Sequence, residues 1–372
     1  MIEFQAVTKK YPDGTVAVDS LDLTVDDGKI TVFVGPSGCG KTTSLRMINR
    51  MIDPTGGTIL LDGKDIRESD PPLLRRGIGY VIQHAGLFPH RTVLDNVATV
   101  PLLTGTGKRE ARQKAGELLE LVGLDSGFAK RYPAQLSGGQ QQRVGVARAL
   151  AADPPVLLMD EPFSAVDPIV RDDLQQQLLR LQSELDKTIV FVTHDIDEAI
   201  KLGDRVAVFR VGGRLAQYDT PSALLAKPAD GFVSSFVGRD RGYRALGFLT
   251  ANGVPVGPIA TVKVGEQAGS LDGDWAVAVD ADNKPLGWVS KQSAQNGEVS
   301  ADNLVSGGSL FEVDSAAGGT SGSLRNALDA ALSSPSAVGI AVDAGGAVVG
   351  GVTADTVLAA LADARRSGEV PT

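Results

Sequence analysis

Cysteine is almost missing from this chain of 372 residues, in which Cys39 is the single example. One thiol excludes an internal disulfide and leaves no second cysteine with which to build a metal cluster. Cys39 lies in a glycine-rich loop whose chemistry, described below, does not need a thiolate. We therefore expect neither a disulfide framework nor a cysteine-based metal site.

Long apolar runs and an excess of positive charge are also missing. No stretch approaches the roughly eighteen continuous apolar residues of a membrane span, and residues 1–5 lack the basic and then apolar pattern of a secretory signal. The net charge of -9 argues against nonspecific nucleic-acid binding as the main activity. We expect a cytoplasmic protein without a nucleic-acid partner.

The composition changes near residue 240, beyond which the chain becomes rich in Gly, Ala and Val. A chain of this length suggests two or three domains, and two is our working number. We predict a first domain at residues 1–240, a linker at residues 241–245, a second domain at residues 246–366 and a tail at residues 367–372.

Hydrophobic patterning predicts the elements of the first domain. Two hairpins come first, one joining residues 2–8 to residues 15–18 and the next joining residues 21–25 to residues 29–34. Further strands are predicted at residues 77–83, 156–159, 188–193 and 206–209, and helices at residues 108–122 and 168–185. Apolar strands that alternate with helices predict an α/β fold, with a parallel sheet at its core and an antiparallel strand layer before it.

A glycine-rich loop at residues 35–43, which we call the phosphate loop, follows the apolar run at residues 30–34. It fits the pattern G-x-x-x-x-G-K-[ST]. Its glycines let backbone N–H groups point inward, and the following helix start adds positive partial charge, so a polyphosphate finds several donors. Lys41 would neutralise the outer phosphates and Thr42 would bind magnesium. The predicted nucleotide contacts are Gly35, Ser37, Gly38, Cys39, Gly40, Lys41, Thr42 and Thr43. A plain glycine turn is the alternative.

Two carboxylates, Asp160 and Glu161, end the apolar run at residues 156–159. An α/β sheet presents its ligand groups at the carboxyl ends of its strands. Asp160 is suited to hold Mg²⁺, directly or through water, and Glu161 to polarise an attacking water. A solvated turn is the alternative for such a pair.

A third motif, the LSGGQ segment (residues 136–140), begins a predicted helix. Ser137 can cap that helix, and Gly138 and Gly139 leave its first amides bare, which again favours an anion. With His194 after the run at residues 188–193, the motifs at residues 1–240 resemble the nucleotide-binding subunit of an ABC transporter.

The resemblance implies roles for individual residues. Tyr11 would stack on adenine, Gln83 would reach the Mg²⁺ site, and Asp167 would lie in the segment that communicates between sites. His194 would contact the γ-phosphate. Alternatives that need no nucleotide are a hairpin aromatic for Tyr11, a solvated strand end for Gln83 and a hydrogen-bonded structural histidine for His194.

The resemblance also implies a head-to-tail homodimer, in which each ATP lies between the Lys41 loop of one chain and the LSGGQ segment of the other. The residues that the second chain would supply are Ser137, Gly138, Gly139 and Gln140. A helical subdomain is expected within the ATPase domain, beside its parallel sheet.

Residues 75–93 and 167–171 resemble subunits of osmoprotectant importers for glycine betaine, choline, carnitine or proline. This implies integral membrane permease subunits, docked at Leu87, Phe88 and Pro89, and an extracytoplasmic solute-binding protein that acts indirectly or is fused to the permease. The chain would then lie at the cytoplasmic face of the membrane. Alternatives are the motor of a sugar or amino-acid importer, a soluble ABC ATPase, and a ligand-binding regulator with a vestigial motor.

The second domain contains a repeat, because residues 276–290 match residues 339–353 at a constant offset of 63. Each copy predicts a strand, a tight turn and a second strand. The pair resembles the tandem CBS module of the same importers, which implies a smaller α+β regulatory domain. Adenosine-binding members carry an Asp where this chain has Ser293 and Thr356, which leaves the ligand open. A structural or dimerising role is the alternative.

Overall fold

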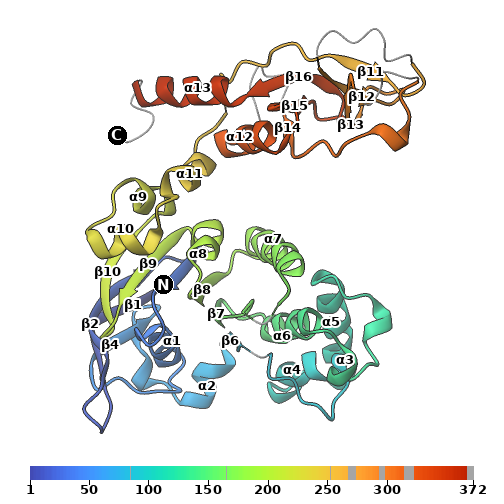
Figure 1. Cartoon of the computed structure of the whole chain (residues 1–372). Helices are drawn as coiled ribbons and strands as arrows, with labels where there is room; N and C mark the ends of the chain where they lie inside the picture. The colour runs from blue at the N-terminus through green and yellow to red at the C-terminus, as the bar shows by residue number, and fades with distance from the viewer. Residues whose placement is uncertain are drawn as a thin grey trace. The chain divides into compact units, whose positions relative to one another are not determined.

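A computed structural model describes residues 1–83, 85–164, 166–251, 253–266, 274–292, 298–313 and 322–366, apart from the side chain of Ile169. Its contacts divide the chain into two compact units, Met1–Val237 and Gly238–Thr372 (Figure 1). Ser293 and the tail predicted at residues 367–372 lie outside the described residues. No helix in the part of the chain that the structure describes is long and apolar enough to cross a membrane.

The first unit is built on a six-stranded sheet in which every neighbouring pair is parallel except the one formed by the edge strand β10. Its order is β10 (Arg214–Asp219), β9 (Arg205–Arg210), β3 (Ile30–Val34), β8 (Thr188–Thr193), β7 (Val156–Asp160) and β6 (Ile78–Val81). Strands β3, β7 and β8 are buried along their whole length, which explains their continuous apolar sequence. The predicted α/β fold with a parallel core is confirmed.

A second, antiparallel sheet packs against this core. Its order is β2 (Val16–Val25), β1 (Ile2–Lys10), β4 (Gly56–Leu61) and β5 (Lys64–Asp65). The rings of Phe4 on β1 and Phe33 on β3 lie edge to face with their centroids 6.3 Å apart, within one apolar cluster shared by the two sheets.

One hairpin prediction is wrong. β1 and β2 form the first hairpin, with Ile2 opposite Val25, but β2 and β3 do not pair and belong to different sheets. The turn around Gly28, whose φ is 64°, carries the chain from one sheet to the other. Since β3 is buried on all five residues, its favourable place is inside the parallel core, between β9 and β8.

The helices of the first unit comprise two sets, of which the second lies together at one side of the unit (Figure 1). One group comprises α1 (Lys41–Ile48), α2 (Pro71–Arg76), α7 (Pro168–Leu185), α8 (Ile196–Leu202), α9 (Pro221–Ala226) and α10 (Gly231–Val237). The other forms the expected helical subdomain, with α3 (Val93–Val97), α4 (Thr99–Leu103), α5 (Lys108–Leu121) and α6 (Gly138–Leu150). Short 3-10 helices lie at η1 (Ile66–Glu68), η2 (Ser126–Phe128) and η3 (Pro133–Gln135).

The second unit begins with a helix, α11 (Arg241–Ala245), where we predicted a linker, and continues into η4 (Leu246–Phe248). Tyr243 and Leu246 pack against the apolar cluster of this unit, so the segment is held by tertiary contacts. The contacts divide the two units after Val237, close to the end that we predicted for the first domain at residue 240.

The repeat is confirmed at the level of strands. β11 (Thr261–Lys263), β12 (Trp275–Val279) and β13 (Pro285–Ser290) form one three-stranded sheet, and β14 (Leu310–Glu312), β15 (Val338–Val342) and β16 (Val348–Thr353) form another. In both sheets the first strand runs parallel to the second, and the second antiparallel to the third.

The second copy contains two helices. Helix α12 (Leu324–Ser333) lies between β14 and β15, and α13 (Ala354–Arg366) follows β16. In the first copy, the described part of residues 264–274 holds no helix, and the described residues after β13 hold only the 3-10 helix η6 (Ala301–Asn303). Among the described residues, the pseudo-symmetry that the sequence predicts is seen in the strands.

Candidate functional site

The phosphate loop connects β3 to the first residue of α1, Lys41. Gly40 has a φ of 96°, and a Cβ placed on it would lie 2.1 Å from the carbonyl oxygen of Ala17 on β2. Only glycine allows both this conformation and this approach. The antiparallel sheet thus packs directly on the last turn of the loop.

Lys41 is folded back into its own loop. Its Nζ donates hydrogen bonds to the carbonyl oxygens of Gly35, at 2.7 Å, and Pro36, at 3.1 Å, and its side chain is buried. These two carbonyl partners carry no net charge, so they do not neutralise the ammonium, which lies in a buried position at a helix N-terminus. Such a group attracts a phosphate strongly.

Thr42 and Asp160 meet at the carboxyl edge of the sheet. The hydroxyl of Thr42 donates to Oδ1 of Asp160 at 2.8 Å, and Asp160 is 6% exposed. Mg²⁺ prefers oxygen ligands and is usually held by one or two carboxylates together with substrate phosphates. The described residues hold no group of three or more His, Cys, Asp or Glu side chains placed to bind a metal. The hydroxyl of Thr42 and the carboxylate of Asp160 are oxygen groups of the kind that Mg²⁺ accepts as ligands.

Two residues near Asp160 were not predicted. The hydroxyl of Tyr80 on β6 donates to Oδ2 of Asp160 at 3.4 Å, and Nη2 of Arg46 on α1 lies 3.7 Å from the same oxygen. Burial, followed by the charge of Asp160, raises the pKa of Tyr80, so Tyr80 stays a neutral donor. Arg46 follows Thr42 by four residues and so lies on the same helix face, which was the available signal.

Glu161 and His194 form the second pair of the site. Nδ1 of His194 lies 3.1 Å from Oε2 of Glu161. When the carboxylate is ionised it can only accept, and Nδ1 is then the donor in this contact. Glu161 has a φ of 45°, an unfavourable conformation for a residue with a Cβ, and its N–H donates to the carbonyl of Val192 at 3.0 Å. The strained backbone of Glu161 thus occurs at the residue whose carboxylate contacts His194.

Ser137 and Gln140 form a capping box at the start of α6. The hydroxyl of Ser137 accepts from the N–H of Gln140 at 3.3 Å, and Oε1 of Gln140 accepts from the N–H of Ser137 at 3.0 Å. Gly138 is exposed and Gly139 is buried. A Cβ on Gly139 would lie 2.8 Å from Cγ1 of Val170, so this glycine also allows α6 to approach α7 closely.

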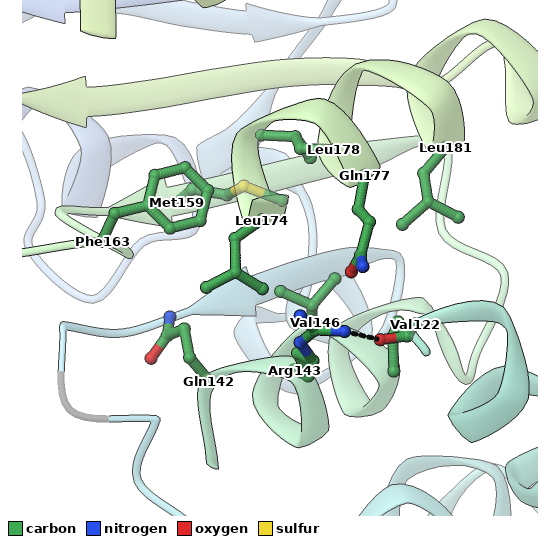
Figure 2. A pocket seen from close by; sticks show the side chains of 10 residues that line it. All are labelled: Val122, Gln142, Arg143, Val146, Met159, Phe163, Leu174, Gln177, Leu178 and Leu181. Carbon is green, nitrogen blue, oxygen red and sulfur yellow. Dashed lines mark hydrogen bonds between the residues drawn. The ribbon is translucent and has the colours of Figure 1, made fainter. Parts of the chain in front are cut away.

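An apolar pocket lies between α6 and α7 (Figure 2). Its walls include Val146 of α6, Met159 of β7, and Leu174, Leu178 and Leu181 of α7. Arg143 of α6 donates to the carbonyl of Val122 at 3.2 Å at the edge of the pocket. The LSGGQ segment is thus carried on a helix that rests on α7 mainly through apolar contacts.

The LSGGQ segment and the phosphate loop lie in different parts of the first unit. α6 packs against α3, α5, α7 and β6, whereas α1 packs against β2, β7 and β8. Lys41, Thr42, Asp160, Glu161 and His194 gather at one sheet edge, and the structure does not bring Ser137 to Gln140 into that group.

Tyr11, Gln83 and Asp167 lie at the ends of elements. Tyr11 is half-buried at the tip of the β1–β2 hairpin, where Nζ of Lys9 lies 5.4 Å from its ring centroid. Gln83 is exposed two residues beyond β6. Asp167 precedes α7, and its carbonyl accepts from the N–H of Arg171 at 2.8 Å. Their nucleotide-related roles stay predictions.

The segment at Leu87, Phe88 and Pro89 leaves Phe88 41% exposed. The buried amide of Asn96 fixes this segment, because it accepts from the N–H of Phe88 at 2.7 Å and donates to its carbonyl at 3.2 Å. The guanidinium of Arg91 lies over the Phe88 ring, 5.1 Å from its centroid. An exposed aromatic on a well-held loop is typical of a protein contact surface.

Comparison with known proteins places these motifs in context. The family model described as "ABC transporter" matches residues 18–164. The osmoprotectant import ATP-binding protein OsmV of Salmonella typhimurium is 49% identical over 309 residues, which cover 80% of this chain and 81% of that protein. The glycine betaine/carnitine/choline transport ATP-binding protein OpuCA of Bacillus subtilis is 52% identical over 241 residues, 65% of this chain and 63% of that protein.

Solved structures are similar over the first unit. The ATP-binding cassette MJ0796, a dimer in a post-hydrolysis state bound to ADP and Pi, is 35% identical with a TM-score of 0.55. The match covers 59% of this chain and 99% of that chain.

The environment of Cys39 gives a prediction. Its thiol is buried, and burial raises its pKa despite the nearby charge of Lys41. At pH 8 it is therefore less ionised than an exposed thiol, and alkylation by iodoacetamide should be at least about tenfold slower in the native chain than in urea. Mass spectrometry of the labelled peptide gives both rates, with Cys39→Ser as the unlabelled control. Equal alkylation rates for the native and the unfolded chain would contradict the burial of the Cys39 thiol.

Proposed function

The chain belongs to the family of ABC transporter ATP-binding proteins, and from this premise we propose that it is the ATP-hydrolysing motor of an importer for quaternary-amine osmoprotectants. The proposed class of solute is supported by sequence identity of 49% to 52% with relatives that are named for osmoprotectant, glycine betaine, carnitine and choline transport. Proline is a further candidate solute. The pairing of Thr42 with Asp160 supports the ATPase chemistry most directly.

In the proposed nucleotide site, the loop amides and Lys41 bind the phosphates, and Tyr11 stacks on adenine. Thr42 and Asp160 would hold Mg²⁺, with Gln83 beside them, and the ion would neutralise charge on the outer phosphates. Lys41 needs only to exchange the carbonyls of Gly35 and Pro36 for phosphate oxygens, since its ammonium already lies inside the loop.

Glu161 polarises the attacking water in this proposal, and His194 orients Glu161 while it contacts the γ-phosphate. The 3.1 Å contact between Nδ1 of His194 and Oε2 of Glu161 supports the division of roles, because it leaves Nε2 of the ring available to another partner. The turn strain at Glu161 favours a fixed carboxylate position, which general-base catalysis needs.

A homodimer completes the site in our proposal. Ser137, Gly138, Gly139 and Gln140 of one chain would contact the nucleotide held by Lys41 of the other, and Asp167 would lie near the interface. The packing of α6 and α1 against different elements supports this, since the two motifs do not share a site within one chain.

The membrane partners follow from the same premise. Permease subunits would dock at Leu87, Phe88 and Pro89, which places the motor at the cytoplasmic face of the membrane. A solute-binding protein would act outside, separately or fused to the permease. The exposed ring of Phe88 on a loop held by Asn96 supports a docking surface.

A carboxamide at position 161 tests the motor. Glu161→Gln should lower the ATPase kcat at least about a hundredfold, because it removes the general base, while it keeps ATP affinity. The ATP-bound variant should become dimeric in sedimentation experiments. Glu184→Gln, which changes an exposed carboxylate on α7, is the matched control and should behave as the wild type. A monomeric Glu161→Gln variant with normal hydrolysis would contradict the motor function.

For the second unit, we propose a CBS-like regulatory role. A chain that ends after Val237, where the first unit ends, should keep ATPase activity. In the assembled transporter it should lose the response of that activity to ionic strength or to added nucleotide. ATPase assays across a salt series measure this response. If truncated and full-length transporters responded alike, the second unit would have only a structural role.

A further inference from the structure

Glu198 of α8 is a buried carboxylate beside the proposed catalytic pair that the ATPase chemistry above does not use. It is 6% exposed. Its Oε2 accepts from the hydroxyl of Thr193 at 2.6 Å, and its Oε1 accepts from Nε2 of Gln175 on α7 at 3.4 Å. The Thr193 hydroxyl in turn accepts from the N–H of Asp195 at 3.0 Å. Glu198 therefore contacts Thr193 directly and is linked to Asp195 through the Thr193 hydroxyl, and these two residues flank His194.

Arg171 of α7 extends this network to a second loop. Its Nε lies 4.0 Å from Oε1 of Glu198, and its Nη1 lies 4.0 Å from Oδ2 of Asp195. Its Nη2 donates to the carbonyl of Val166 at 3.2 Å, one residue before Asp167. One guanidinium thus spans the turn of His194 and the main chain that leads into α7.

These groups surround a small polar hollow that also borders the catalytic pair. Glu161, His194, Arg171 and Glu198 are among its lining residues. Nε of Arg171 is buried and donates no hydrogen bond to any described residue. The network therefore borders the same hollow as Glu161 and His194, and it contains one buried donor without a hydrogen bond among the described residues.

Stability alone does not account for the buried charge. Burial, with a smaller contribution from the charge of Asp195, raises the pKa of Glu198, whereas Thr193, Arg171 and His194 act in the opposite direction. A carboxyl whose pKa is raised on folding is destabilising once it ionises, so its contribution to stability falls as the pH rises above its ordinary range. A neutral residue of the same size would serve the fold at least as well.

We propose that Glu198 and Arg171 are positioning residues, which hold the turn of His194 in register with Glu161 and tie that turn to the main chain before Asp167. This inference rests on the proposed function. The Glu198 carboxylate fixes Thr193 and Gln175, and Arg171 joins the same carboxylate to the carbonyl of Val166. Loss of either charge frees the imidazole of His194 to leave Glu161.

Steady-state ATPase kinetics of the full chain test the proposal. Glu198→Gln keeps the size of the side chain and removes its charge. Because small misplacements of reacting groups reduce rates strongly, Glu198→Gln should lower kcat at least about tenfold. Its KM for ATP should stay within about twofold of the wild-type value. Its unfolding midpoint at pH 8 should be no lower than that of the wild type. Arg171→Met should lower kcat to a similar extent. The double variant should be no slower than the worse single variant, since both changes break one unit.

The same two helices offer a matched control. Lys201 of α8 and Asp172 of α7 form an exposed ion pair, and Asp172 also accepts a hydrogen bond from Nε2 of Gln176. Asp172→Asn should therefore leave kcat unchanged. The proposal is overturned if kcat of Glu198→Gln stays within about twofold of the wild type, or if the loss of kcat is matched by a lowered unfolding midpoint. It is also overturned if the double variant shows the product of the two single effects on kcat.

The Glu161→Gln variant separates this failure from a failure of the proposed function. If Glu161→Gln is also fully active, the proposed function fails. If Glu161→Gln is inactive, only the positioning role of Glu198 and Arg171 fails.

Discussion

The hydrogen bond between Thr42 and Asp160 is the contact on which the site depends. It joins the helix after β3 to the end of β7, two strands separated in the sheet by β8. Parallel register makes this possible, because Val34 lies opposite Thr193 and Asp160 lies opposite Val192. A shift of one residue in either pairing would reverse the side of Asp160 and separate the two oxygens. Lys41, Glu161 and His194 all follow from the same aligned edge.

The edge concentrates charge that water does not reach. Lys41, Asp160 and Glu198 are all buried, and each is held by polar partners within its own or a neighbouring element. Buried charges are costly unless they are paired or used. In our account, Lys41 and Asp160 are used for phosphate and Mg²⁺, and Glu198 is used to keep His194 beside Glu161. The strained backbone of Glu161 fits the same account, because strain of this kind is found where a functional side chain must keep one position.

Much of this arrangement could be predicted from the sequence where the signal is local. The bounds of β8 and α7 match the predicted runs at residues 188–193 and 168–185, because an unbroken apolar strand and a helical apolar period leave little ambiguity. The turn at Gly28 was misread, since the same residues suit a hairpin and a crossing between sheets. The positions of Tyr80 and Arg171 beside the site depend on strand register and helix docking, which local patterns do not encode.

Metal binding tests the central claim most directly. Mn²⁺ replaces Mg²⁺ as an EPR-visible probe, titrated into the full chain with a nonhydrolysable ATP analogue. If Thr42 and Asp160 hold the ion, Thr42→Ser should keep the wild-type Mn²⁺ affinity, because serine retains the hydroxyl. Thr42→Val removes the hydroxyl and should weaken Mn²⁺ binding about tenfold or more, a loss of roughly 1.4 kcal/mol or more. Equal Mn²⁺ affinity for Thr42→Val, Thr42→Ser and the wild type would contradict the account.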